Sequence, residues 1–289
     1  MSDKIRIDEE LGVSGGHFLY ATRLIEKTQT EYQEVEVYNT DLFGKLFKLD
    51  GYFMTSEVDE FLYHENMIHV PLMPNAAPKS ALIIGGGDGG SAEELLKYPS
   101  MQKVVMVELD KKVVDIAKEH LERVHHNAFD DPRLQLLIED GLKYVREIAP
   151  ESGLTFDLIV LDLTDPIGPS EALYTEQFFN DCKKLLTKEG TISLHIGSPI
   201  FTPDLPKSLL VKLRKVFKQV TPYLVYIPLY GTLWGMACAS DGISPASIPP
   251  EKVDQKIANT PLTHLQFLND QTYQGLFAIP NYLKPVLCV

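Results

Sequence analysis

From residue 81 onward, short apolar segments alternate with segments of helical periodicity, and this alternation limits the fold more than any other feature of the sequence. The apolar segments are residues 81–84, 104–108, 134–138, 158–161 and 191–196. The helical segments are residues 92–98, 111–122, 142–148, 175–186 and 205–216. Strands that alternate with helices in this way form parallel βαβ units, with helices on both faces of one sheet. The sequence therefore predicts a doubly wound α/β fold.

The two ends of the chain follow other patterns. Residues up to about 60 contain alternating segments such as "EYQEVEVYN" and an Asp-Gly turn, which are typical of antiparallel strands. Near the other end, "YLVYIPLY" and "LWGMACAS" flank a Gly-Thr turn and predict a hairpin that adds an antiparallel strand to the sheet. We therefore expect a small β domain over residues 1–60 and a Rossmann-like, methyltransferase-type domain over residues 61–289.

The charge balance argues against a nucleic-acid-binding protein. The chain has 289 residues, with 40 acidic and 27 basic side chains and a formal net charge of −13, whereas nucleic-acid binding requires a basic surface. The three cysteines are widely spaced, the first residues lack the apolar core of a signal peptide, and no apolar run reaches the roughly 20 residues of a membrane span. We expect a cytoplasmic enzyme that binds small molecules, and its negative field would favour a cationic substrate.

Acidic side chains follow four consecutive strands at the edge of the sheet where ligands bind, which is formed by the carboxyl ends of the strands. The first strand leads into the turn "GGGDGG", in which Gly85, Gly87 and Gly90 satisfy the G-x-G-x-x-G spacing between a strand and a helix. The four acids are Asp88 inside this turn, Glu108, Asp140 with its neighbour Gly141, and Asp162. Four such acids indicate a shared ligand, although any one of them can instead cap the helix or turn that follows.

The carboxylate of Asp88 limits what this ligand can be. Phosphate groups approach the glycines and the helix N-terminus of such turns, and a negative charge there repels them. Glu108 lies where an acid normally binds ribose hydroxyls, and Asp140 can accept a hydrogen bond from the adenine amine. We therefore expect an adenosine with a cationic tail. Decarboxylated S-adenosylmethionine fits, because it lacks the carboxylate that Asp88 would repel.

Through these residues the chain resembles the polyamine aminopropyltransferases, and among them the spermidine synthases. The segments that carry the resemblance are "EYQ" (31–33), "LDG" (49–51), "DEFLYHENMIHVPL" (59–72), "LIIGGGDGG" (82–90), "VELD" (107–110), "DDPRLQLLIEDG" (130–141) and "DLTDPIGPSEALYT" (162–175). The resemblance implies transfer of the aminopropyl group of decarboxylated S-adenosylmethionine to putrescine, giving spermidine and 5′-methylthioadenosine. It also implies a homodimer and no cofactor, since the nucleoside is a co-substrate.

The resemblance further implies the roles of individual residues. On the side of the nucleoside it places Gln33, Asp88, Glu108, Asp140, Gly141 and Pro169. On the side of the amine it places Tyr63, His64, Asp88, Asp162, Asp165 and Tyr230. An alkyl amine is nearly all ammonium at neutral pH and then has no lone pair, so a positioned carboxylate must take a proton. We expect Asp162, at the strand end nearest the nucleoside, to be this base.

The sequence departs from the family pattern near the expected acceptor site. Met54 and His195 stand where the family usually has glutamine, the loop "PLYG" has Leu229 where threonine is usual, and the N-terminal tryptophan of the family is absent. Cadaverine, agmatine and spermidine are therefore alternatives to putrescine. An S-adenosylmethionine methyltransferase and a non-catalytic polyamine-binding protein are the rival hypotheses. His125 and His126 fit a solvated face and His69 fits a structural position, and we expect no metal site.

Overall fold

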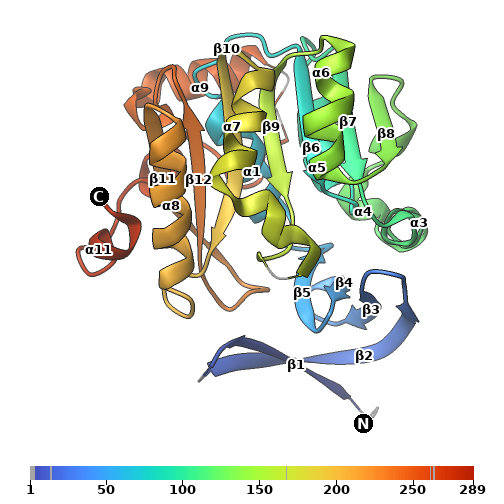
Figure 1. Ribbon diagram of the computed structural model, residues 1–289. Coiled ribbons are helices and arrows are strands. Elements are labelled where there is room, and N and C mark those ends of the chain that lie inside the picture. Colours follow the sequence, from blue (N-terminus) through green and yellow to red (C-terminus); the bar gives the residue numbers. More distant parts are fainter. Residues whose placement is uncertain (1–3, 14, 167, 261, 263) are drawn as a thin grey trace.

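The computed structural model describes residues 4–13, 15–166, 168–260, 262 and 264–289, and it contains two sheets (Figure 1). The smaller sheet is antiparallel, with the strand order β1-β2-β3-β4-β5. Its strands are β1 Ile5–Gly12, β2 Gly15–Gln29, β3 Glu34–Thr40, β4 Gly44–Leu49 and β5 Tyr52–Ser56. The alternation of apolar and polar residues produces this sheet, since successive side chains point to opposite faces.

The larger sheet has seven strands in the order β11-β12-β10-β9-β6-β7-β8. Its strands are β6 Ser80–Gly85, β7 Lys103–Glu108, β8 Leu134–Ile138, β9 Phe156–Asp162, β10 Leu186–Gly197, β11 Gln219–Ile227 and β12 Thr232–Ser240. Strands β6 to β10 are parallel, and β12 runs antiparallel to both of its neighbours. The predicted Rossmann-like sheet with its late antiparallel strand is therefore confirmed.

Helices cover both faces of this sheet. The main helices are α1 Phe61–Leu72, α2 Gly90–Leu96, α3 Lys111–His120, α7 Glu176–Leu185 and α8 Asp204–Val216. Alternate residues of β6 enter separate cores. Ala81 and Ile83 belong to a cluster that includes residues of α1 and α2, whereas Leu82 and Ile84 join residues of α7 and α8. Figure 1 shows α7 and α8 in front of the sheet and α1 behind it. A strand buried on both faces needs a continuous apolar run, as in "ALII".

The sequence patterns did not predict α1 or the last three helices. Every residue of α1 from Tyr63 to Leu72 is buried, polar ones such as Glu65 and Asn66 included, so the helix has no solvent-exposed polar face and no amphipathic period from which it could be recognised. The last helices are α9 Pro250–Asn259, α10 Asp270–Leu276 and α11 Lys284–Leu287. The predicted helix at 142–148 forms α5 Gly141–Lys143 and continues through a π turn, Tyr144–Ile148, into α6 Ala149–Ser152.

Two consequences of the fold bear on function. The strand order reverses between β6 and β9, where chain connections leave in opposite directions and a ligand crevice is expected. In Figure 1 the smaller sheet lies below the larger one, with β5 next to the ends of its strands. Among the described residues, none of the helices is both long and apolar enough to cross a membrane.

Candidate active site

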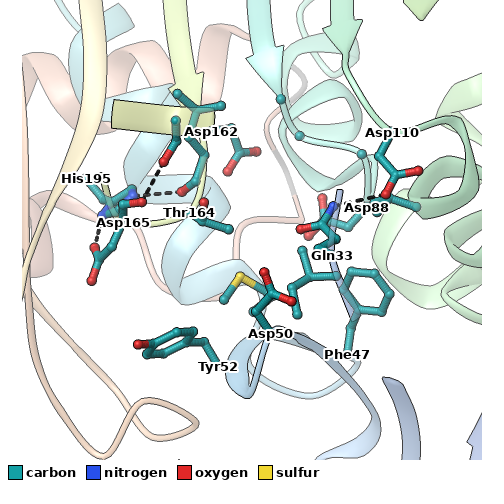
Figure 2. Close-up of a pocket in the computed structure, with 18 of the residues that line it drawn as sticks. Gln33, Phe47, Asp50, Tyr52, Asp88, Asp110, Asp162, Thr164, Asp165 and His195 are labelled. Carbon is teal, nitrogen blue, oxygen red and sulfur yellow. Dashed lines mark hydrogen bonds and ion pairs between the residues drawn. The ribbon is translucent and has the colours of Figure 1, made fainter. Parts of the chain in front are cut away.

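A cavity of about 330 Å³ lies at the carboxyl ends of β6, β7 and β9 and is completed by residues of the smaller sheet. Figure 2 shows Gln33 and Asp110 at one side of this cavity and Asp165 and His195 at the other. We call these the nucleoside side and the amine side. The cavity lining includes the predicted residues Gln33, Tyr63, His64, Gly85, Gly87, Asp88, Glu108, Asp140, Gly141, Asp162, Asp165 and Tyr230.

One predicted residue, Gly90, is not part of that lining; it is the first residue of α2. Another, Pro169, lies outside the part of the lining that the structure describes. Pro169 belongs to a 3-10 helix, Gly168–Tyr174, and its side chain lies outside the described part of the structure. Its predicted position over the nucleoside therefore stays a prediction.

The glycine turn needs glycine because other groups approach its backbone closely. Gly85 has a φ of +82°, and a Cβ there would collide with the carbonyl oxygen of Asp162. A Cβ on Gly90 would collide with the imidazole of His64. The lack of side chains thus allows β9 and α1 to bring Asp162 and His64 against the turn.

Local hydrogen bonds fix the acidic groups of the nucleoside side, of which Glu108 and Asp110 are buried and Asp140 is exposed. Glu108 Oε1 accepts from the backbone N of Asp110 at 2.9 Å. Burial, and then the charge of Asp110, raise the pKa of Glu108 to about 7. Gln33 lies in the loop that precedes β3, and its Nε2 donates to Asp110 Oδ2 at 3.3 Å. This hydrogen bond links the loop to the residues that follow β7. Asp140 Oδ1 caps α5 by accepting from the N of Leu142 at 2.7 Å, so this acid both caps a helix and lines the cavity.

Asp88 has a buried histidine partner. His64 lies with its Nε2 3.5 Å from Asp88 Oδ2 and its Nδ1 2.7 Å from Glu60 Oε2. Burial would lower the pKa of His64, but Asp88 and Glu60 raise it well above its usual value. Burial would likewise raise the pKa of Asp88, yet the His64 cation holds it below its ordinary value. The carboxylate of the glycine turn is therefore ionised and supported from behind by a cation.

Asp162 lies at the end of β9 and differs from Asp88 in its protonation chemistry. Its Oδ2 accepts a hydrogen bond of 2.6 Å from Ser91 Oγ in the first turn of α2. Burial, followed by the negative charge of Asp88, raises the pKa of Asp162, although His64, Ser91 and Tyr63 oppose the shift. A carboxylate with a raised pKa is a better proton acceptor than an ordinary aspartate.

No sequence pattern indicated that Glu9 and Trp234 line the amine side of the cavity. Glu9 on β1 is only 5% exposed, and its Oε1 accepts from the backbone N of Phe53 at 2.8 Å. Burial raises the pKa of Glu9 to about 8. Trp234 on β12 stacks on His195, with ring centroids 5.7 Å apart. The predicted residue Tyr230 donates from its hydroxyl to the carbonyl of Met54 at 2.7 Å. Neither Glu9 nor Trp234 belongs to a recognisable motif.

Among the residues that the structure describes, two groups of side chains have the composition of a cation site. His64, Asp88 and Asp162 offer ligand atoms within 4.8 Å of one another inside the cavity, and Glu26, Glu119 and His120 do so at the surface. The first group already contains the ion pair of His64 with Asp88. An organic ammonium is as well matched to its two carboxylates as a metal ion, and the absence of a metal stays a prediction.

Comparison with known proteins agrees with this geometry. The spermine/spermidine synthase domain matches residues 60–244, and the spermidine synthase tetramerisation domain matches residues 27–57. The first match alone covers more than half of the chain. The chain belongs to the spermine/spermidine synthase family. The predicted resemblance is thus confirmed, and the cavity described above is the candidate active site of a member of this family of aminopropyltransferases.

Individual relatives cover nearly the whole chain. The polyamine aminopropyltransferase of Nitrosomonas europaea is 43% identical over 279 residues, which are 96% of this chain and 85% of the relative. That of Sulfurisphaera tokodaii is 35% identical over 94% of this chain and 89% of the relative. A crystal structure of spermidine synthase in complex with the transition-state analogue AdoDATO matches with a TM-score of 0.90 at 34% identity, covering 98% of this chain and 95% of that one. Spermidine synthase from Thermotoga maritima matches with a TM-score of 0.89 at 33% identity, over 99% and 95%.

Proposed function

We propose that this chain transfers the aminopropyl group of decarboxylated S-adenosylmethionine to putrescine, giving spermidine and 5′-methylthioadenosine. The observation that carries the proposal is the position of Asp162, a carboxylate of raised pKa, beside the ionised Asp88 of the glycine turn. Membership of the family supports aminopropyl transfer, and the relatives named spermidine synthase support putrescine as the acceptor.

In the proposed reaction each carboxylate acts on a different substrate. Asp88 binds the ammonium of the aminopropyl arm and disfavours a donor that still has its carboxylate. Asp162 takes a proton from the acceptor amine, whose lone pair then forms a bond to the aminopropyl carbon next to the sulfur. The carbon–sulfur bond breaks, and the sulfonium takes the electron pair to become the neutral thioether of methylthioadenosine. No cofactor takes part in this scheme, since the donor is consumed as a co-substrate.

The nucleoside side supports adenosine as the group that carries the sulfonium. In this proposal Glu108 accepts hydrogen bonds from the two ribose hydroxyls, and Gln33 and Asp110 line the cavity with it. Asp140 and Gly141 lie at the next strand end, where we place the adenine. This arrangement would also suit intact S-adenosylmethionine. The methyltransferase hypothesis is disfavoured by Asp88, because its charge opposes the carboxylate of that compound.

The experiment that tests the function is an assay with one donor and a panel of acceptors. The purified protein is incubated with decarboxylated S-adenosylmethionine and, in turn, putrescine, cadaverine, agmatine and spermidine, and the products are identified by mass spectrometry. We expect methylthioadenosine and spermidine, with putrescine as the preferred acceptor. Preference for another amine would overturn the acceptor. A methylated product from intact S-adenosylmethionine would instead support a methyltransferase, and no product at all would support a binding protein.

We also propose self-association and a cytoplasmic location. Apolar side chains are exposed on the first hairpin, among them Ile5, Phe18, Tyr20 and Leu24, and exposed apolar groups on one element favour an interface. A homodimer was expected, and the tetramerisation domain that matches residues 27–57 makes a tetramer the alternative. Light scattering coupled to size-exclusion chromatography distinguishes the two. The three free cysteines are consistent with a reducing compartment.

A further inference from the structure

A buried histidine is already paired with the carboxylate to which we assign the ammonium of the donor. His64 is only 2% exposed and stands between two acids. Its Nδ1 lies 2.7 Å from Glu60 Oε2, and its Nε2 lies 3.5 Å from Asp88 Oδ2. His64 and Asp88 line the cavity, whereas Glu60 does not belong to its lining. The imidazole therefore connects a carboxylate outside the cavity to a carboxylate within it.

The two acids keep this imidazole charged before any substrate binds. A carboxylate can only accept a hydrogen bond, so Nδ1 carries a hydrogen that it donates to Glu60. Burial alone would lower the pKa of His64, but Asp88 and then Glu60 raise it well above its usual value. Both ring nitrogens are therefore protonated, and the site contains one cation between two carboxylates.

The other groups on the cavity side of His64 leave its charge in place. Asp162 on β9 is close, because ligand atoms of His64, Asp88 and Asp162 all lie within 4.8 Å of one another. Tyr63 holds its ring at 85° to the imidazole, with centroids 5.3 Å apart, and burial raises the pKa of this phenol well above its usual value. The phenol is therefore neutral. The backbone of Gly90 packs directly against the imidazole and holds it between its two acids.

Two further ionisable groups lie on the helices beside the glycine turn. The sequence favoured a solvated position for His125, but this last residue of α4, Glu122–His125, is buried. Burial lowers the pKa of His125, so its ring is neutral at pH 8. Burial, with a smaller contribution from the charge of Glu60, raises the pKa of Glu93 on α2 to about 7. Neither of these two groups brings a second cation to the carboxylate in the cavity.

The donor itself would bring a second cation to Asp88. Its aminopropyl arm ends in a primary ammonium, and an ordinary pKa of about 10 keeps such a group charged at pH 8. Two cations beside one carboxylate repel each other, and water screens them poorly where His64 is buried. Loss of one proton from the imidazole removes this repulsion. The neutral ring still donates from Nδ1 to Glu60 and offers the lone pair of Nε2 to the ammonium.

We propose that the donor ammonium takes the place of a proton on His64, so that binding of decarboxylated S-adenosylmethionine releases this proton to solvent. The N–H bond at Nε2 breaks, its electron pair stays on the ring, and the ammonium donates hydrogen bonds to Asp88 and to this lone pair. The net charge of the site is unchanged, because one cation replaces another. Glu60 is a positioning residue, since its hydrogen bond to Nδ1 determines that Nε2 becomes the acceptor. The inference rests on the proposed function, because it concerns the same donor.

The test counts the protons released on binding at pH 8, where the carboxyl of Glu108, with its pKa of about 7, is mostly ionised already. Calorimetric titration in two buffers of different ionisation enthalpy gives this number. The two ligands are decarboxylated S-adenosylmethionine and methylthioadenosine, which lacks the aminopropyl arm. The parent should release about one proton more with the first ligand than with the second. Its affinity for the donor, relative to methylthioadenosine, should then rise by up to about tenfold per pH unit.

Two variants assign the released proton to this pair of residues. His64→Gln keeps an amide that can donate to Asp88 but cannot titrate, so the difference between the two ligands should disappear. Glu60→Gln removes a charge that raises the pKa of His64. The difference should become smaller at pH 8 and should recover at a lower pH, where His64 is again charged. Both variants should bind methylthioadenosine as the parent does. Glu251→Gln makes the same change in the first turn of α9, at an exposed position, and should match the parent throughout.

The contrary results are distinct from one another. Equal proton release with the two ligands in the parent would overturn the inference. An unchanged difference in His64→Gln would overturn it too, and would make Asp162 the group that loses the proton. Weaker binding of methylthioadenosine by Glu60→Gln would show that Glu60 only maintains the structure. If the parent binds methylthioadenosine but not the decarboxylated donor, the proposed function itself fails, and the inference fails with it.

Discussion

Ser91 Oγ donates a hydrogen bond of 2.6 Å to Asp162 Oδ2, and this contact joins the first turn of α2 to the end of β9. The glycine turn therefore does more than leave room for a nucleoside. It brings a hydroxyl donor to the carboxylate that we propose as the base. Because Ser91 favours the ionised form of Asp162 while burial and Asp88 favour the protonated form, the protonation of this aspartate depends on all three.

The first prediction concerns this hydrogen bond. Ser91→Ala removes a group that lowers the pKa of Asp162, so the pKa should rise further. A base accepts a proton only when it is ionised, and the acidic limb of the rate–pH profile should therefore move to higher pH in the variant. The rate at the alkaline plateau should change little. A profile of kcat/KM from pH 5 to 9 measures this shift. If the acidic limb of the variant coincides with that of the parent, Ser91 does not influence the group that titrates.

The second prediction concerns the base itself. Asp162→Asn should retain both substrates but lose about 10²–10⁴-fold in turnover at neutral pH, the usual contribution of a general base. Raising the pH should restore part of the rate, because more of the amine then arrives unprotonated. Asp165→Asn is the matched comparison, since it should impair acceptor binding more than turnover. A small deficit in the Asp162 variant with the parent's pH dependence would make Asp165 the candidate base.

The third prediction concerns selection of the donor. Asp88→Asn removes the charge that attracts the aminopropyl ammonium and repels a carboxylate at the same place. Affinity for decarboxylated S-adenosylmethionine should fall by about tenfold or more, and discrimination against the intact compound should narrow. The pKa of His64 should also fall, since Asp88 raises it. Competition binding with the two compounds tests this, and unchanged discrimination would remove Asp88 from donor selection.

Much of the site could be predicted because its signals are local in the sequence. The turn from Gly85 to Gly90 directly follows an apolar strand, and Glu108, Asp140 and Asp162 each follow a strand of the same sheet. Parallel strands bring such ends together automatically. The structure places the first residues of the turn, Gly85 to Asp88, and all three acids at one cavity. Their individual roles in binding and catalysis await the variants described here.

The missed residues depend on contacts between distant parts of the chain. Glu9 reaches the cavity because β1 folds over β5, and its partner Phe53 is 44 residues away. His195 was singled out in the sequence, but its contacts with Leu163 and Tyr174 were not, because they arise from the pairing of β10 with β9 and from the 3-10 helix that follows β9. Helix α1 was missed for another reason, since a helix buried on all sides has no polar stripe. The local sequence pattern reveals neither the contacts between distant residues nor a helix that is buried on all sides.

The fourth prediction concerns Glu108 and has a defined pH window. Its pKa of about 7 means that the free site becomes fully ionised only above neutral pH. The ionised carboxylate accepts hydrogen bonds from ribose more strongly than the acid does, so methylthioadenosine should bind more tightly as the pH rises from 6 to 8. In Glu108→Gln the affinity should be roughly one to two decades weaker at pH 8 and nearly independent of pH. Calorimetric titration at both pH values measures this, and an unaltered affinity would make Glu108 a structural cap.

The last prediction concerns the stability of the protein rather than its rate. The fold raises the pKa of Glu9 from 4.5 to about 8, mainly by burial, and therefore favours its protonated form. Below pH 4.5 the folded and unfolded chains both hold the proton, and Glu9 costs nothing. Between pH 4.5 and 8 the carboxyl of Glu9 ionises in the unfolded chain but not in the folded one, so the free energy of unfolding falls as the pH rises, by at most on the order of 5 kcal/mol. Glu9→Gln removes this titration.

Thermal unfolding at pH 5 and pH 8 shows whether this linkage holds. The parent should lose more of its Tm between these values than Glu9→Gln, and the variant should be the more stable protein at pH 8. Glu10→Gln changes the same charge at an exposed neighbour on β1 and should follow the parent. Equal pH dependence in the parent and the Glu9 variant would contradict the prediction. Added putrescine should narrow the difference in Tm between the parent and Glu9→Gln at pH 8. An ammonium near Glu9 and Asp165 favours the ionised form of Glu9, which burial opposes.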